Sequence, residues 1–172
     1  IVYDVIYGGY GGRASKDGAE ALCPVFNAAN IPVEVHETQS PVRIRTMALV
    51  PDTGGAGQFR GGCALRKEIE VLAPHATASL SGDRHRFSPP GAAGGDAGSA
   101  AQSLLEREGK VHTLGSKDVL EVQSGDVLTI QLSGAGGFGP KENRDRQAIA
   151  DDIADGFVTP EAAKRDYGYD DA

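Results

Sequence analysis

The chain has 172 residues, 40% of them hydrophobic and 24% charged, as expected for one globular domain with its own core. A formal net charge of −7 argues against nucleic acid or an anionic membrane surface as a partner. No apolar run approaches the roughly 20 residues that span a bilayer.

The first residues, Ile1-Val2-Tyr3-Asp4, include no initiator methionine and do not open a secretory signal peptide. We interpret this start as that of a chain broken out of a longer polypeptide. The two cysteines, Cys23 and Cys63, form no CxxC pair, so neither a disulfide framework nor a zinc ribbon is predicted. Reduced cysteines are typical of the cytosol, and we therefore expect a cytoplasmic protein.

Alternation of apolar and polar residues with a period of two is typical of β-strands. It recurs over residues 32–37, 42–50, 65–72, 119–122 and 127–132. Ser124-Gly125-Asp126, between the last two segments, predicts a β-hairpin or a turn.

Helical patterning is confined to three regions. Residues 16–30 carry apolar side chains at helical spacing, and residues 99–107 form a shorter candidate. In the tail, residues 143–155 predict a helix that ends at a glycine C-cap. Thr159 followed by Pro160 predicts the start of a second tail helix, which runs to about Tyr167.

These elements predict an α+β fold, in which a β-rich domain with Gly-rich loops spans residues 1–142. A short helical C-terminal tail follows over residues 143–172. Glycine is the compositional anomaly, because 24 glycines are about twice the average share. They gather in four clusters, at residues 8–12, 54–62, 91–98 and 134–139.

Two interpretations of these clusters remain open. Successive glycines can turn backbone N–H groups toward one point and form a nest for an anion. They can equally form tight turns or allow two backbones to approach closely. Residues 134–139 match GxGxxG, but Pro140 follows at once and no ribose-binding acid follows a second strand, so no dinucleotide site is predicted.

The chemistry-bearing side chains form no complete catalytic or metal-binding pattern. The four histidines are scattered without the spacing of metal ligands, so no metal site is predicted in this chain. Arg60 lies among glycines, and Arg84 lies in the basic stretch Asp83-Arg84-His85-Arg86. Arg84 or Arg86 could hold an anionic group bidentately, or the stretch could be a solvated turn or an ion pair with Asp83. Arg60 could anchor its loop through carbonyl groups or a carboxylate.

Several multi-residue motifs, taken in chain order, resemble the C-terminal region of hydantoinase B/oxoprolinase subunits. In the first half these are Gly8-Gly9-Tyr10-Gly11-Gly12-Arg13, Lys16-Asp17-Gly18, Asn30-Ile31-Pro32-Val33-Glu34, and Asp52-Thr53-Gly54-Gly55 through Gly61-Gly62. In the second half they are Ser81-Gly82-Asp83-Arg84, Pro90-Gly91 with Gly94-Gly95, Gly134 to Gly139, Asn143-Arg144-Asp145, and Gly156-Phe157-Val158-Thr159.

The resemblance implies one part of an ATP-dependent amidohydrolase that opens a cyclic amide such as a hydantoin, 5-oxoproline or a lactam. A related branch of the family implies the alternative of ATP-dependent ketone carboxylation. A non-catalytic interaction module is a further alternative. The implied partners are an A-type, ATP-binding subunit, the N-terminal part of the B-type subunit and a small-molecule substrate.

No catalytic residue can be assigned, and no cofactor is expected on this chain. ATP with Mg²⁺ and a divalent metal are expected in the partner regions. On this view the chain is a fragment or a split subunit that contributes the cavity and the interface. Substrate or anion contacts are predicted for Asp52, Gly54, Gly55, Arg60, Arg84, Gly136 and Gly137.

Overall fold

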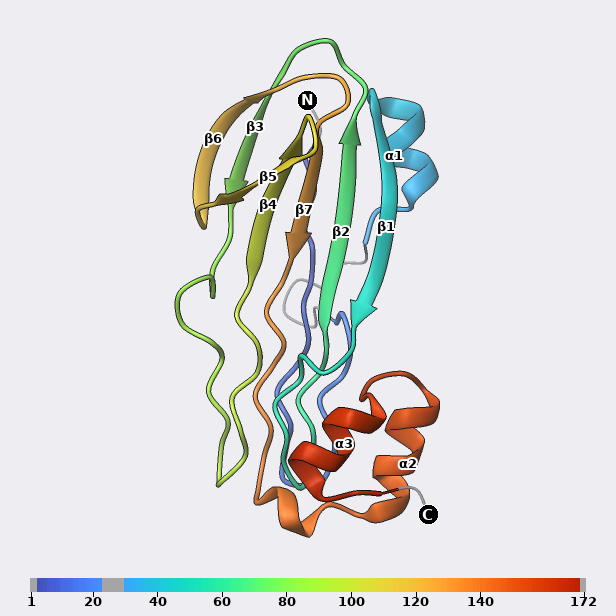
Figure 1. Cartoon of the computed structure of the whole chain (residues 1–172), viewed down its shortest axis with the longest axis vertical. Coiled ribbons are helices and arrows are strands. Elements are labelled where there is room, and N and C mark those ends of the chain that lie inside the picture. Colours follow the sequence, from blue (N-terminus) through green and yellow to red (C-terminus); the bar gives the residue numbers. More distant parts are fainter. Residues whose placement is uncertain (1–2, 23–29, 171–172) are drawn as a thin grey trace.

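The computed structural model describes residues 3–22 and 30–170, and its centre is a five-stranded antiparallel sheet (Figure 1). The strands, in spatial order, are β1 (Val42–Val50), β2 (Ala64–Val71), β7 (Val127–Gln131), β4 (Gln102–Arg107) and β5 (Lys110–Leu114). Leu128 of β7 pairs with Ile69 of β2 and with Leu105 of β4. Directly paired residues share a face, so these three apolar side chains form one row.

A second sheet of two antiparallel strands, β3 (Ala76–Ser81) and β6 (Lys117–Val122), packs against this row. Val122 of β6 is buried with Val71, Leu105 and Leu128 in one hydrophobic cluster. Residues 124–126 connect β6 to β7, but the two strands belong to different sheets. The predicted turn is therefore confirmed, whereas the hairpin is wrong.

Beyond the lower end of the sheet in Figure 1, extended segments without regular secondary structure run side by side. We call them the glycine layer, and they comprise residues 8–12, 54–62, 91–98 and 134–139. Backbone hydrogen bonds join them: Gly12 donates to Gly136 (2.9 Å), Gly55 to Ala135 (2.8 Å) and Gly137 to Asp96 (2.9 Å).

The helical elements are α1 (Val33–Gln39), the 3₁₀ turn η1 (Lys141–Asn143), α2 (Arg146–Ala154) and α3 (Pro160–Tyr167). The last two pack together at the glycine-layer end (Figure 1) around buried Ile149, Val158, Ala162 and Ala163. No helix among the described residues is long and apolar enough to cross a membrane.

The predicted α+β class is confirmed, as are the strands at 42–50 and 65–72 and both tail helices. Local signals define α3: the Thr159 hydroxyl accepts from the N–H of Ala162, and Gly168 ends the helix at φ 59°. β3 and β5 were not predicted. The boundary at residues 142/143 stays a prediction.

Two predicted elements are wrong, and a third is wrong over the part that the structure describes. Residues 33–39 form a helix, because Pro32 precedes it and Val33 and His36, three residues apart, turn inward. Gln102–Arg107 is a strand, with Ser103 and Leu105 buried, Gln102 and Glu106 exposed, and Leu104 half-buried between them. Residues 16–22 are not helical, and the rest of the predicted helix at 16–30 lies largely outside the described residues.

Candidate functional site

Six of the seven predicted contact residues are gathered at the end of the main sheet where β1 ends and β2 begins. Gly54, Gly55 and Arg60 lie in the loop between these strands, and Gly136 and Gly137 follow β7. The N–H of Gly61 donates to Gly55 (3.0 Å), so the loop closes on itself. Arg84 lies apart from this group, in the connection between β3 and β4.

The predicted glycines allow backbones to approach more closely than any side chain would permit. A Cβ atom on Gly54 would collide with the carbonyl oxygen of Gly61, and one on Gly55 with that of Asp96. Added Cβ atoms on Gly136 and Gly137 would likewise collide with carbonyl oxygens, those of Pro90 and Ala56. The interpretation as close backbone approach is therefore confirmed at these four positions.

The N–H groups of Gly55 and Gly137 donate to carbonyl oxygens within the glycine layer, those of Ala135 and Asp96. An anion nest needs N–H groups that converge on a ligand, and these two point at the protein's own backbone. The role of the glycines as anion contacts stays a prediction.

Arg60 is buried, with 3% of its surface exposed, and its guanidinium group is surrounded by groups of its own chain. Nε donates to Asp152 of α2 (3.2 Å), and Nη1 donates to Glu20 (2.9 Å) and to the carbonyl of Gly61 (2.7 Å). The ring of Phe157 lies 4.8 Å from the guanidinium carbon. The side chain thus joins the N-terminal segment, the glycine layer and the tail.

A second buried arginine, Arg144, extends this network. Its Nη2 donates to Asp152 (2.5 Å), and Nη1 and Nη2 donate to the two carboxylate oxygens of Asp17 (2.9 and 3.0 Å). Asp17 also accepts from the N–H of Arg60 (2.6 Å). Asp152 therefore bridges two arginines, and the whole set of Asp17, Glu20, Arg60, Arg144 and Asp152 is called the arginine network below.

The electrostatics of the network follow from burial and pairing. Burial alone disfavours the charged form of Asp17, but the hydrogen bonds and charge of Arg144 outweigh it and lower the pKa of that carboxyl. Burial is likewise outweighed at Arg60 and Arg144, whose carboxylate partners raise the pKa of both guanidinium groups. The two guanidinium groups and the Asp17 carboxylate are therefore charged at neutral pH.

Two neutral side chains beside the network are held in their protonated forms. Burial, together with the charge of Glu20, raises the pKa of the Cys63 thiol to about 11. Burial also raises the pKa of the Tyr167 hydroxyl to about 12. Neither group is available as a base or a nucleophile near neutral pH.

Asp52 anchors the tail helix α3 to the end of β1. Its carboxylate accepts from the N–H of Thr159 (2.7 Å) and from the Thr159 hydroxyl (2.8 Å). Its N–H donates to the carbonyl of Phe157 (3.0 Å), and its φ of 61° is the left-handed conformation in which aspartate is one of the tolerated residues. Both carboxylate oxygens of Asp52 thus have partners within the chain.

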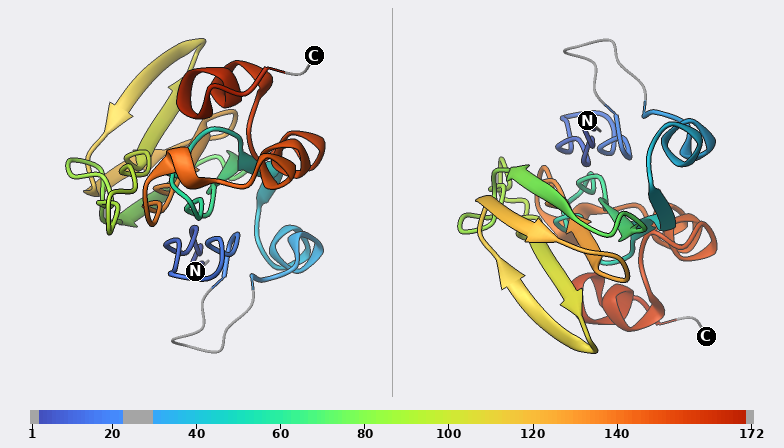
Figure 2. Two further views of the ribbon diagram at one scale, coloured as in Figure 1. Left: turned by 90° about the horizontal axis from the view of Figure 1, so that it is seen from below. Right: turned by 90° about the horizontal axis from the view of Figure 1, so that it is seen from above.

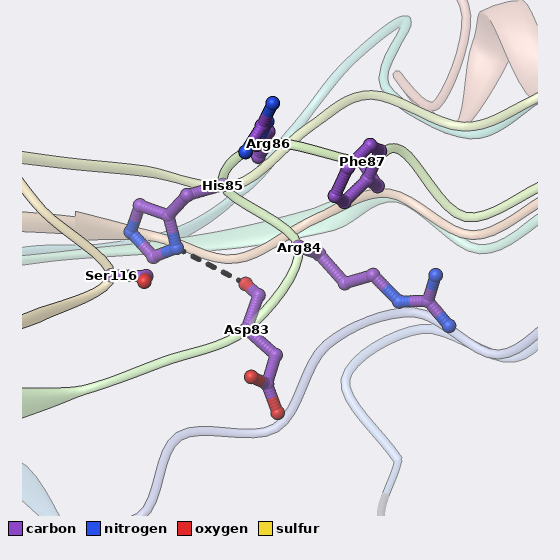
Figure 3. Close-up of a pocket in the computed structure, with 6 residues that line it drawn as sticks. All are labelled: Asp83, Arg84, His85, Arg86, Phe87 and Ser116. Atoms are coloured by element: carbon purple, nitrogen blue, oxygen red, sulfur yellow. Dashed lines mark hydrogen bonds between the residues drawn. The ribbon is translucent and has the colours of Figure 1, made fainter.

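Arg84 lies in a surface hollow lined by Asp83, Arg84, His85, Arg86, Phe87 and Ser116 (Figure 3). His85 holds the loop in place: Nδ1 lies 3.1 Å from the carbonyl of Asp83, and Nε2 lies 2.9 Å from the hydroxyl of Ser103. Arg84 has a φ of 66°, and Figure 3 shows its side chain extending away from the His85 ring. Among the described residues, its exposed guanidinium group has no ion-pair or hydrogen-bond partner.

A separate buried charge cluster lies on the main sheet and was not predicted. Lys67 of β2 is 2% exposed, and its ammonium group donates to Asp4 (2.6 Å). Nε2 of His36 lies 3.5 Å from the other oxygen of Asp4. The one available signal was parity, because Lys67 stands two residues from Ile69 and four from Val71 and so shares their inward face.

Arg144 and Asp17 lie in motifs that carry the resemblance, but no spacing pattern marks them as partners of each other or of Asp152. Within residues 3–22 and 30–170, no three His, Cys, Asp or Glu side chains are gathered in the way that a metal ion would require.

Comparison with known proteins identifies the family. The model of the hydantoinase B/oxoprolinase family matches residues 1–141. The B-type subunit of a putative D-/L-hydantoinase from a Pseudomonas species is 33% identical over 98% of this chain and 29% of its own length. The beta subunit of the caprolactamase from Pseudomonas jessenii is 31% identical over 98% of this chain and 30% of its own length. The chain therefore belongs to the hydantoinase B/oxoprolinase family, and it spans about 30% of the length of these relatives.

Two solved structures share the fold. The crystal structure of the ATP-dependent caprolactamase from Pseudomonas jessenii matches 95% of this chain and 30% of its own, with a TM-score of 0.81 and 26% identity. A nucleotide-free acetone carboxylase structure matches 94% of this chain and 26% of its own, with a TM-score of 0.74. Its identity of 21% supports similarity of fold alone.

Proposed function

We propose that this chain is the C-terminal part of the B-type subunit of an ATP-dependent amidohydrolase that opens a cyclic amide. The observation that carries the proposal is the match to the ATP-dependent caprolactamase over 95% of the chain. The 33% identity to the putative hydantoinase points to the same class of substrate, because hydantoins and caprolactam are both cyclic amides. Ketone carboxylation is the weaker candidate, since the acetone carboxylase match concerns the fold alone.

The partners that this function requires are an A-type subunit, which would bind ATP and Mg²⁺, and the rest of the B-type subunit with its divalent metal. The relatives support this division, because the chain spans only about 30% of their length. The contribution proposed for this chain is a rigid wall for the active-site cavity and a surface for assembly. A cytoplasmic location belongs to the same proposal.

Arg84 is proposed as the contact for an anionic group of the substrate or of the activated intermediate. Its guanidinium group is exposed and unpaired within the described residues, and a positioned loop holds its backbone. The N–H of Ala101 donates to its carbonyl (3.0 Å), which ties that loop to the segment entering β4. A planar guanidinium suits carboxylate or phosphate groups, which it can bind bidentately.

Arg60, Asp52 and the four glycines are proposed to act on the same cavity indirectly, by fixing the shape of the glycine layer. The guanidinium group of Arg60 is already paired with Glu20 and Asp152. An anion contact at Nε or Nη1 of Arg60 would require one of these carboxylates to move away. The geometry therefore supports a positioning role for Arg60.

The test is ATP turnover by the assembled complex with hydantoin, 5-oxoproline and caprolactam, against acetone or acetophenone with bicarbonate. Amide-dependent ATP hydrolysis with release of the ring-opened product supports the proposal. Turnover with ketones alone would establish carboxylation instead. A purified complex without an ATP-binding partner and without turnover on either class would favour a non-catalytic module.

A further inference from the structure

The N-terminal segment Tyr3–Gly9 lies on the face of the main sheet that carries Lys67, yet it belongs to neither sheet. Figure 1 shows it running along the strands, and Figure 2 shows it on the side of the molecule where α1 lies. Exposure alternates over its first residues: Tyr3 is 79% exposed and Val5 41%, whereas Asp4 and Ile6 are half-buried. This alternation is that of a β-strand with one face buried.

The inward face of the segment is fixed. Asp4 accepts from buried Lys67 (2.6 Å) and lies 3.5 Å from His36 of α1. A buried ammonium group requires such a partner, since an unpaired buried charge is strongly destabilising. Further along, a Cβ on Gly9 would collide with the carbonyl oxygen of Gly62, so the segment enters the glycine layer in close contact.

The backbone of the segment, by contrast, is unpaired among the described residues. Within the described part of the chain, none of the N–H or C=O groups of residues 3–9 has a backbone hydrogen-bond partner; pairing begins at Tyr10, which donates to Ala19. A fixed, extended segment with unpaired backbone groups and apolar outward side chains is a template for another strand. Tyr3 and Val5 are large apolar side chains that stand exposed on the outward face of this segment.

We infer that residues 3–9 pair with a β-strand from the part of the B-type subunit that lies outside this chain. This rests on the proposed function, which requires that part. The relatives have enough additional chain to supply such a strand, because they are more than three times as long as the matched region. The added strand would carry apolar side chains at alternate positions, where they would cover Tyr3 and Val5.

Hydrogen exchange of the assembled subunit tests the inference. In the isolated 172-residue chain, the amides of residues 3–9 should exchange rapidly. In the assembled subunit, about half of them should exchange at least about 100-fold more slowly, because a strand on one side engages alternate residues. Equal exchange in the two samples would overturn strand addition.

A pair of double variants makes the test independent of the isolated chain. Tyr3→Lys with Val5→Lys places two charges on the face that the added strand covers. It should accelerate exchange of residues 3–9 in the assembled subunit by about 10-fold or more. Val111→Lys with Val119→Lys, at exposed positions of β5 and β6, is the matched control and should leave this exchange unchanged. No difference between the two double variants would overturn the inference.

ATP turnover by the same samples separates this inference from the proposed function. Active enzyme whose residues 3–9 gain no protection would overturn strand addition and leave the function standing. Protection in a complex that turns over neither amides nor ketones would support strand addition and overturn the function.

Discussion

Arg60 and Asp152 are 92 residues apart in sequence, yet Nε of the arginine lies 3.2 Å from the carboxylate, with both side chains almost completely buried. This contact fastens the helical tail to the glycine layer. It also places Arg60 in the arginine network, where Asp152 and Glu20 accept from Nε and Nη1 of its guanidinium group.

Removal of this guanidinium should destabilise the fold. Arg60→Ala leaves Glu20 without its arginine partner, although the N–H of Cys63 still donates to it, and leaves Asp152 with one arginine instead of two. Breaking a buried ion pair costs about 3–5 kcal/mol. Urea unfolding followed by circular dichroism measures the loss. Arg43→Ala is the control, because this arginine is 63% exposed and should cost less than about 1 kcal/mol. Equal effects of the two changes would refute a structural role for Arg60.

The close backbone contacts of the glycine layer predict that the methyl group added by a Gly→Ala substitution destabilises the fold. In Gly55→Ala, the new Cβ would lie 2.8 Å from the N atom of Gly137 and would collide with the carbonyl of Asp96. Such overpacking costs about 1–3 kcal/mol or more. Gly115→Ala is the matched control, since the nearest atom would lie at 3.6 Å. Comparable midpoints of thermal unfolding for the two variants would contradict the packing role.

The turn between β6 and β7 should make stability depend on pH. The hydrogen bond from Arg107 lowers the pKa of Asp126 below its ordinary value of 3.8, and the N–H of Gln123 adds to this effect. The carboxylate therefore stabilises the fold above its unfolded-state pKa, and this stabilisation is lost as the pH falls through the lower folded-state pKa. Asp126→Asn should be less stable than wild type at pH 7, and the gap should narrow between about pH 5 and pH 2. A gap independent of pH would disprove the coupling.

Cys63 should resist alkylation in the folded protein. Its side chain is completely buried, and burial raises the pKa of its thiol to about 11, so the reactive thiolate is scarce at pH 8. Mass spectrometry of the Cys63 peptide after iodoacetamide treatment should show labelling at least about 100-fold slower than in urea. Rapid labelling without denaturant would mean that the glycine layer opens readily.

The sequence predicted those parts of the fold whose causes are local. Thr159, Pro160 and Gly168 define α3 by themselves, and the strand patterns at 42–50 and 65–72 match β1 and β2. Residues 32–37 were wrongly predicted to be a strand. Alternation of apolar and polar residues over only six positions is also compatible with a short helix that packs one face against the rest of the fold. In this case it is His36 that faces Asp4.

The candidate site was predicted less completely. The motifs singled out the loop at residues 54–62 and Arg60 within it. A single sequence does not show that Arg60 contacts Asp152, or that Lys67 contacts Asp4, 63 residues away. Such pairs are fixed by tertiary packing, and residue type reveals only that each buried charge must find a partner.

Arg84 gives the sharpest functional prediction, because its exposed guanidinium group makes no hydrogen bond or ion pair with the described residues of its own chain. Arg84→Ala should leave the free energy of unfolding within about 0.5 kcal/mol of wild type. In the assembled complex it should lower kcat/KM for the cyclic amide about 10-fold or more, as expected for the loss of a charge-assisted hydrogen bond. Arg84→Lys should recover only part of this loss, since an ammonium group cannot bind an anion bidentately. Arg43→Ala, which removes an exposed arginine from β1, should retain full turnover. Wild-type kcat/KM in Arg84→Ala would exclude an anion contact at this position, and the hollow around His85 would then be a structural feature of the loop.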